Sequence, residues 1–353
     1  MSLLNSDRSA APRRVSQRMQ LILVLPGLPE LRAGITASVR APALAHLLAM
    51  AGVPTRESGG IAAALAARYG VIRQADWPLA PIRLAALGVD PGAAFWLAAD
   101  PVTLAVGRND VRLAGIVEDL TRTDADALVA TLNAHFASDG LTFVAPRPDA
   151  FFVRAATRTV LATQAPGAAL GRPLHQLLPE GADAGAWRRW QAEIEMLLHE
   201  HPVNTGRERE GRSPANSVWF SCGGTMRQAP VPPVATRTFA AAGIAATLAA
   251  HAGSPARGLP GHLGAVREDA GRAESIVVAL EPALEVAALE RAWAAPAREA
   301  LAAGAFDAVT LLADDMGDAV VWHARRPGFW PRFAARYTRH DLAALLIGAS
   351  TNH

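Results

Sequence analysis

The sequence predicts an α/β fold: a three-layer domain, with helices on both faces of a sheet, that carries a mostly antiparallel inserted region. Three observations lead to this prediction. The chain opens on a strand–loop–helix pattern over residues 20–52. It has a strand–helix–strand pattern over residues 275–313, which is the βαβ unit of a parallel sheet. Between them lie short strand-like runs separated by turn residues, which are typical of antiparallel strands.

The composition limits the functional classes. The 353 residues are 51% hydrophobic, enough for a sizeable core, and carry a formal net charge of only +2. All 34 basic residues are arginine, which excludes lysine Schiff-base catalysis and a lysine-bearing phosphate loop. A single cysteine, Cys222, excludes an intrachain disulfide and a multi-cysteine metal site. Since no apolar stretch reaches about 18 residues, we expect a cytoplasmic protein without membrane contact.

The first third of the chain predicts the start of the α/β domain. Residues 1–19 are rich in arginine and polar residues, and we expect a disordered leader. The continuous apolar run Gln20–Leu25 ends at Pro26 and Gly27, which predicts a buried strand. Leucines at helical spacing over Pro42–Gly52 predict a helix with proline at its entrance and glycine at its exit.

The middle of the chain predicts an antiparallel insert. One helix interrupts its strands: Thr123 or Asp124 is expected to cap it, and Gly140 to end it. The predicted strands are Phe95–Ala98, Val102–Val106, Arg112–Val117, Leu141–Val144, Phe151–Arg154 and Thr159–Thr163.

The last half predicts a return to the α/β domain. A helix over Ala184–Glu200 stops at Pro202, and a polar Arg/Glu-rich loop leads to a strand over Asn216–Ser221. The strand–helix–strand unit then covers Ser275–Leu280, Pro282–Ala303 and Phe306–Ala313. The expected divisions are a disordered leader at 1–19, the first part of the α/β domain at 20–94, the insert at 95–165 and the remainder of the α/β domain at 166–353.

Three segments together resemble one family. They are Ala99–Leu104 (ADPVTL), Leu132–Phe143 (LNAHFASDGLTF) and Met196–Phe220 (MLLHEHPVNTGREREGRSPANSVWF). They look like the proteobacterial E-type regulators of pathogenicity factors, which are described as cofactor-independent phosphoglycerate-mutase-like proteins. The resemblance covers roughly residues 20–330 and implies a sheet of the alkaline-phosphatase/phosphoglycerate-mutase type.

This resemblance implies a specific chemistry, and the sequence departs from it at several positions. The mutase-like relatives use two divalent ions, held by aspartates and histidines, beside a Ser or Thr that is phosphorylated in transit. The first metal-binding aspartate belongs to an Asp-Gly step that reads Pro26-Gly27 here, and a proline side chain cannot ligate a metal. Thr103 stands where the family has histidine, and Ser221-Cys222 stands where it has tryptophan-glycine.

Some candidates for that chemistry persist. The resemblance leaves Thr36 or Ser38 near the place of the nucleophile, and Asp314 and Asp315 end a strand like the one that leads to a metal-binding aspartate. No histidine follows Asp315 at the expected short spacing. One nucleophile and two aspartates do not assemble two metal sites. We therefore expect no cofactor, and Mn or Zn only if the protein is an enzyme.

The most family-like block supplies candidate ligand-binding residues. Guanidinium groups and amides match phosphate or carboxylate oxygens, so a phosphorylated or other anionic small molecule is the expected ligand. The alternative is a solvated loop whose asparagines bond to the backbone. The candidates are His199, His201, Asn204, Arg207, Asn216, Ser217 and Trp219. The two histidines, with Glu195, form a possible metal corner or else a polar helix end.

Three further features each have two interpretations. Aromatic residues interleaved with arginines over residues 330–339 suit either the buried face of a helix or a grip on single-stranded nucleic acid. Asp100 is either a turn residue or a remnant carboxylate of a site. Cys222 is either a packed thiol or a nucleophile, although no histidine lies near it in sequence.

The sequence thus favours a non-catalytic regulatory or ligand-sensing protein on a degenerate phosphoglycerate-mutase-like fold, with a protein partner as a further possibility. The alternative is a metal-dependent phosphomutase or phosphatase. A nucleic-acid-binding module is a third hypothesis, and we expect no nucleic acid as the main partner.

Overall fold

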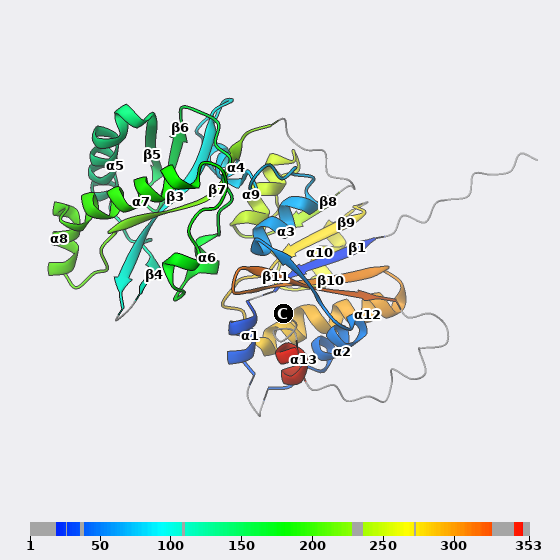
Figure 1. The fold of residues 1–353 in the computed structure, drawn as a ribbon. Coiled ribbons are helices and arrows are strands. Elements are labelled where there is room, and N and C mark those ends of the chain that lie inside the picture. The colour runs from blue at the N-terminus through cyan, green and yellow to red at the C-terminus, as the bar shows by residue number, and fades with distance from the viewer. Residues whose placement is uncertain are drawn as a thin grey trace, which may run out of the picture.

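The computed structural model has two lobes, an α/β lobe and an inserted lobe (Figure 1). It describes residues 19–25, 27–35, 39–107, 110–227, 236–271, 273–326 and 342–348. The predicted leader, apart from Met19, lies outside the described residues, as does the arginine–aromatic segment at 330–339.

The α/β lobe is built on a six-stranded sheet with the order β2-β11-β10-β1-β9-β8. Its strands are β1 (Gln20–Val24), β2 (Thr55–Ser58), β8 (Thr236–Phe239), β9 (Ser275–Ala279), β10 (Ala308–Asp315) and β11 (Asp318–Arg325). The strand β1 lies between β9 and β10 and is parallel to both, whereas β11 and β2 are antiparallel additions at one edge. Residues 21–24 are all buried, as expected for a parallel strand covered on both faces.

Helices cover both faces of this sheet, which gives three layers (Figure 1). Leu21 and Leu23 of β1 face one helix layer, and Ile22 and Val24 face the other. The first layer contains α1 (Leu28–Ala33), α2 (Pro42–Ala51), α10 (Leu263–Asp269), α11 (Val286–Leu289), a π-helical turn (Glu290–Ala294), α12 (Ala295–Ala303) and α13 (Leu342–Gly348). The second contains α3 (Gly60–Arg68), α4 (Leu79–Ala86) and α9 (Ile244–His251).

The inserted lobe has a five-stranded sheet in which every pairing is antiparallel. Its strands are β3 (Phe95–Val106), β4 (Val111–Ile116), β5 (Leu141–Arg147), β6 (Ala150–Ala155) and β7 (Ser217–Thr225). The long β3 pairs with β7 on one edge and with β6 and then β4 on the other. Because β7 belongs to this sheet, the lobe continues past residue 165, the boundary expected from the sequence.

The helices of the inserted lobe are α5 (Arg122–Phe136), α6 (Pro166–Ala169), α7 (Ala184–His199) and α8 (Pro202–Arg209), with short 3-10 turns at Ala137–Asp139 and Leu174–Gln176. Helices α5 and α7 bury Leu132, Phe136 and Trp187 against one face of the sheet. On the other face, α4 packs Leu84 against Trp96 and Phe152. Since α4 also contributes to the core of the α/β lobe, it joins the two lobes.

The α/β class, its layers and the antiparallel insert are therefore confirmed, and four local predictions are corrected. Helix α5 is capped by Thr121, with Asp124 completing the capping box, because their side chains bond reciprocally to each other's backbone N–H. Residues 95–106 form one strand, since Pro101 keeps the pairing with β7. Residues 159–163 make only an isolated bridge, Ala162 with Glu180. The polar loop after Pro202 is helix α8, whose N-cap is His201.

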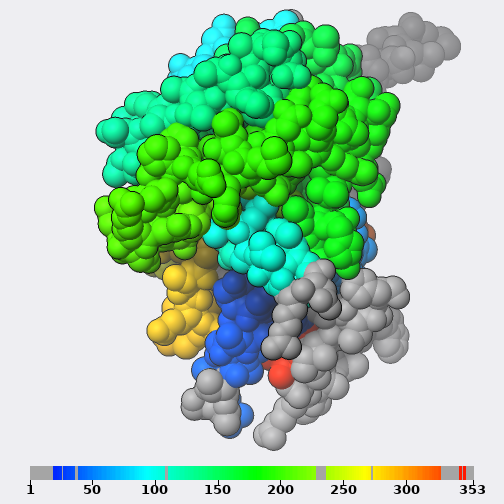
Figure 2. Space-filling model, turned by 60° about the vertical axis from the view of Figure 1, so that its left-hand side comes forward, coloured from blue at the N-terminus to red at the C-terminus, as the bar shows by residue number. Residues whose placement is uncertain are grey.

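The inserted lobe lies directly on the α/β lobe (Figure 2). One contact joins Gly317, in the β10–β11 turn, to Ala168 of α6, and it leaves no room for a Cβ at residue 317. Gly317 also has a φ of 96°, which favours glycine, so both space and backbone conformation fix this residue. Among the described residues, no helix is long and apolar enough to cross a membrane.

Candidate functional site

The carboxyl ends of β1 and β10 meet at one edge of the parallel sheet, where open α/β sheets bind ligands. Asp314 lies at this edge, close to the position that a Cβ on Gly60 would take. Its Oδ1 is buried and has no hydrogen-bond partner among the residues that the structure describes. Burial raises the pKa of Asp314, and a hydrogen bond from the backbone of Gly317 only partly offsets this.

Asp315, the next residue, has the opposite environment. Its carboxylate forms ion pairs with Arg56 at 3.1 Å and with Arg32 at 3.8 Å. The side chain is almost fully buried, so these two guanidinium groups neutralise a charge that has little contact with water. Asp315 therefore ties β10 to β2 and α1.

The candidate metal ligands do not converge in the described part of the chain. His199 is exposed at the end of α7, and His201 contacts Thr131 with 3.0 Å between Nε2 and Oγ1, both within the inserted lobe. Asp314 and Asp315 lie in the other lobe. Among the described residues no group of three or more His, Cys, Asp or Glu side chains could hold a metal ion. These residues do not fit a two-metal site. The nucleophile candidates Thr36 and Ser38, like Pro26, lie outside the described residues.

The candidate ligand-binding residues of the family-like block lie together at the corner between α7, α8 and β7. The buried side chain of Asn204 donates to the carbonyls of Leu198 and Ala215 at 2.8 and 3.0 Å, and accepts from the N–H of Ala215 at 2.8 Å. Arg207 donates to the carbonyl of Ser213 and pairs with Asp119. Main-chain groups and one carboxylate thus occupy these polar atoms.

The other members of that block have similar internal contacts. Asn216 bonds to both the N–H and the carbonyl of Leu104, at 2.8 and 2.9 Å. The indole N–H of Trp219 donates to the carbonyl of Gln164 at 2.7 Å, and Ser217 is fully buried. All of these contacts hold β7 to its neighbours, and none of these residues lines the cavity described below.

The contacts of Asp100 and Cys222 are structural as well. Asp100 accepts two hydrogen bonds from the guanidinium of Arg83, at 3.0 and 3.3 Å, and so fixes α4 to β3. Burial raises the pKa of the Cys222 thiol to about 12, so no reactive thiolate forms near neutral pH. The backbone of Cys222 has a φ of 59°, and its N–H donates a hydrogen bond to the Oγ1 of Thr163 at 2.9 Å.

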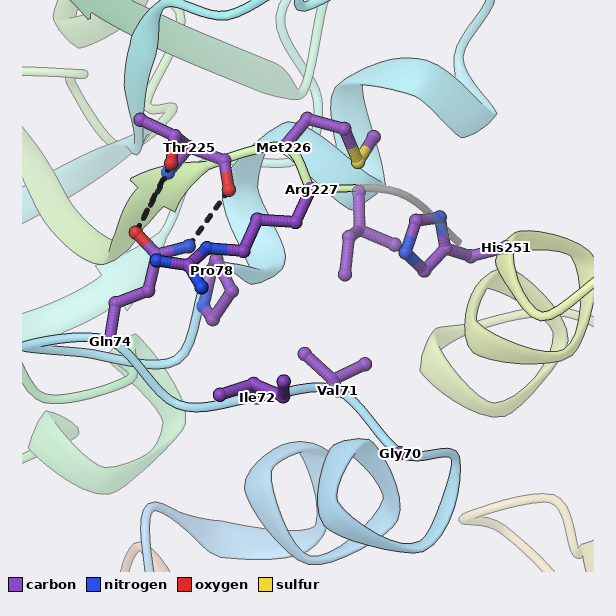
Figure 3. A pocket seen from close by; sticks show the side chains of 10 residues that line it. Gly70, Val71, Ile72, Gln74, Pro78, Thr225, Met226, Arg227 and His251 are labelled. Atoms are coloured by element: carbon purple, nitrogen blue, oxygen red, sulfur yellow. Dashed lines mark hydrogen bonds between the residues drawn. The ribbon is translucent and has the colours of Figure 1, made fainter. Parts of the chain in front are cut away.

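A cavity of about 290 Å³ lies at the junction of the lobes (Figure 3). Three segments distant in the sequence form it: the connection from α3 into α4, the end of β7, and the end of α9. The lining residues are Gly70, Val71, Ile72, Gln74, Pro78, Ile82, Thr225, Met226, Arg227 and His251.

Two local features build this cavity. Gln74 joins the α3–α4 connection to β7, since its side chain donates to the carbonyl of Thr225 at 2.8 Å and accepts from the N–H of Thr225 at 3.2 Å. Gly224 lets α4 approach β7, because a Cβ there would lie only 2.5 Å from the Cβ of Pro78. The Gly223-Gly224 pair thus serves close packing within β7.

Two side chains give the cavity its polarity. Burial lowers the pKa of the half-buried His251, so its ring is neutral at pH 7. Arg227 is exposed and cationic, and no described residue forms a hydrogen bond or an ion pair with it. Sequence reasoning missed both residues, since neither belongs to a recognisable motif. The only local signal was the Gly-Gly pair shortly before Arg227.

Comparisons with known proteins give distant similarity in structure alone. No family model matches the chain, and no curated protein matches it. The cofactor-independent phosphoglycerate mutase from Thermoplasma acidophilum DSM 1728 is similar over 95% of both chains, with a TM-score of 0.44 and 12% sequence identity. The PH0037 protein from Pyrococcus horikoshii is similar over 87% of both chains, with a TM-score of 0.44 and 14% identity. Similarity this distant decides neither the family of this chain nor its activity.

Proposed function

We propose that this chain is a non-catalytic, ligand-sensing regulatory protein that binds a small molecule between its two lobes. The observation that carries the proposal is the cavity lined by α4 and its preceding connection, the end of β7 and the end of α9. A ligand in contact with both lobes favours the arrangement of lobes that it fits best, which is the physical basis of a sensor.

The surroundings of the carboxylates support a non-catalytic role. In the resemblance to mutase-like proteins, Pro26 replaces a metal-binding aspartate. Asp315 is held by Arg56 and Arg32, and the two candidate histidines belong to the other lobe. Two cations beside a nucleophile are the essential parts of that phosphoryl transfer, and the described side chains do not bring such a donor set together. We place the protein in the cytoplasm, as the sequence predicts.

Thermal unfolding of the full chain tests the proposal. Small organic acids and phosphorylated metabolites are added one at a time, and a ligand at about 100 times its Kd should stabilise the protein by about 2.7 kcal/mol. For a chain of this size, that raises Tm by roughly 3–4 °C. The variant Ile72→Glu, in which a charge is added to an exposed lining residue, should lose the shift. Equal shifts with this variant, or no shift with any compound, contradict the proposal.

One observation favours a second candidate, a metal-dependent phosphomutase or phosphatase: the unpartnered Oδ1 of Asp314 at the carboxyl edge of the sheet. Elemental analysis after dialysis against manganese and zinc separates the two proposals. We expect less than about one retained ion per chain for a protein without a two-metal site. Two ions per chain that are lost in Asp314→Asn, together with phosphatase turnover, would favour the enzyme.

A further inference from the structure

The size and lining of the lobe-junction cavity limit the kind of ligand it accepts. At about 290 Å³ it is at the lower end of small-molecule sites, which span roughly 300–1,000 Å³. Most of its lining is apolar, from Val71, Ile72, Pro78, Ile82 and Met226. A ligand that fills this space therefore carries a short apolar part, whose burial contributes to binding.

The polar lining atoms divide into occupied and available groups. The amide of Gln74 already bonds to the N–H and the carbonyl of Thr225, and its Oε1 lies 3.3 Å from the Oγ1 of Thr225. In Figure 3 this pair lies on one side of the cavity and His251 on the other. Arg227 and His251 have no such partners among the described residues, so they are the groups available to a ligand.

The charge of the lining is uniform in sign. The lining residues include one guanidinium group, that of Arg227, and no carboxylate. An organic cation would be repelled, and a neutral molecule would leave the guanidinium without a charged partner. An oxyanion is attracted by the positive charge and gives the guanidinium group a charged partner. A guanidinium group binds carboxylate or phosphate oxygens in a bidentate manner.

We propose that the lobe-junction cavity binds a small amphipathic oxyanion, with a carboxylate or phosphate head on Arg227 and a short apolar chain against Val71, Pro78, Ile82 and Met226. This inference rests on the proposed ligand-sensing function and adds to it the chemical class of the ligand.

Isothermal titration calorimetry of the full chain tests this inference with four probes of equal chain length: octanoate, octyl phosphate, octanamide and octylammonium. We expect the two anions to bind at least tenfold more tightly than the amide, and octylammonium not to bind. A preference for octanoate over octyl phosphate, or the reverse, identifies the head group.

Three variants locate the bound anion. Arg227→Gln should weaken octanoate about tenfold, the size expected for a charge-assisted pair that stays partly in water. Ile72→Glu should weaken it at least as much, because a carboxylate at the rim repels an anion. The matched control is Arg209→Gln, which removes the same charge from an exposed position on α8 and should leave the affinity unchanged.

The outcomes separate the two proposals. If octanamide binds as tightly as octanoate and Arg227→Gln has no effect, the oxyanion inference is overturned, while a small-molecule site between the lobes persists. If octanoate binds equally well to all three variants, the binding is elsewhere and the inference is again wrong. If none of the four probes binds, both the oxyanion inference and the proposed ligand-sensing site fail.

Discussion

Two sets of polar residues differ in their contacts, one in the inserted lobe and one in the α/β lobe and at the lobe junction. In the inserted lobe, Asn204, Asn216 and Arg207 direct nearly all their polar atoms at main-chain groups or at Asp119. In the α/β lobe and at the lobe junction, Asp314 and Arg227 have atoms without partners among the described residues. The residues of the family-like block are therefore structural in their contacts. Of the two residues with available atoms, the sequence singled out Asp314 but not Arg227.

This difference has a physical reason. The inserted lobe has sharp corners between α7, α8 and β7, and each corner leaves main-chain donors and acceptors that the regular ladders do not pair. Short amide side chains are well suited to pair them. A polar cluster in such a segment indicates a corner that needs partners.

The largest expected effect is on stability in the inserted lobe. Asn204→Ala leaves the N–H and the carbonyl of Ala215 without the side chain that pairs them, and removes one of the donors to the carbonyl of Leu198. We therefore expect the free energy of unfolding to fall by about 3 kcal/mol. Urea unfolding followed by tryptophan fluorescence measures this. The exposed Glu208→Ala on the same helix should change it by less than about 0.5 kcal/mol. A loss of similar size in both variants would contradict the structural role of Asn204. The affinity for octanoate should change in neither variant.

A smaller loss is expected where α4 joins the sheet of the inserted lobe. Asp100→Asn removes the carboxylate that faces Arg83, whose side chain is 32% exposed. Because water partly screens this pair, we expect a loss of about 2 kcal/mol rather than the larger values of fully buried pairs. The same urea experiment measures the loss. An unchanged midpoint would mean that the pair is not needed to hold α4 in place.

Two adjacent aspartates sharpen the comparison, since their replacements should act in opposite directions. Asp314→Asn removes a half-buried charge with an unpartnered oxygen and should stabilise the protein by up to about 1 kcal/mol at pH 7, after allowance for solvent screening. Asp315→Asn breaks ion pairs to Arg56 and Arg32 and should destabilise it.

The pH dependence of the free energy of unfolding tests the surroundings of Asp314. The pKa of Asp314 is raised above 3.8 in the folded chain, so the folded state binds a proton more readily than the unfolded state. The contribution of Asp314 to the free energy of unfolding is therefore most favourable below pH 3.8. It is lost as the pH rises through the pKa of Asp314 in the folded chain. Asp314→Asn should remove this part of the acid profile. Identical profiles for wild type and variant would show that Asp314 has ordinary surroundings.

The smallest effect concerns His251 at the lobe junction. Its pKa is lowered by burial, so below about pH 6.5 the unfolded chain takes up a proton that the folded chain binds less readily. Stability should therefore fall between pH 7 and pH 5. His251→Gln should reduce this fall by a few tenths of a kcal/mol, because the ring is only half buried. Chemical unfolding at both pH values measures it, and an equal fall in the variant would place the ring in open water.

Much of the α/β lobe could be predicted from the sequence because its signals are local. The apolar run that forms β1 and the leucines of α2 lie next to proline and glycine residues. The hydrophobic pattern and the residues that end each element therefore predict the same bounds. Helix α8 was missed because it is almost entirely polar, and its stability comes from the contacts of Asn204 and Arg207 rather than from an apolar stripe.

The lobe-junction cavity could not be predicted, for a different reason. It is assembled from Gly70–Ile82, Thr225–Arg227 and His251, and no spacing rule connects these segments. The joint between them is a single side chain, Gln74, that bonds to the main chain of Thr225. A pairing of this kind depends on the tertiary structure and leaves no periodic pattern in the sequence.

The place of β1 at the centre of its sheet has a consequence for biosynthesis. Of the described strands this one emerges from the ribosome before the others, yet both of its neighbours, β9 and β10, begin only at Ser275 and Ala308. The inserted lobe, by contrast, is complete by Thr225, and its strands pair among themselves. We expect the insert to fold on the nascent chain while both edges of β1 remain unpaired. A chaperone that shields short apolar segments would therefore act on residues 20–25 until β9 and β10 have been synthesised.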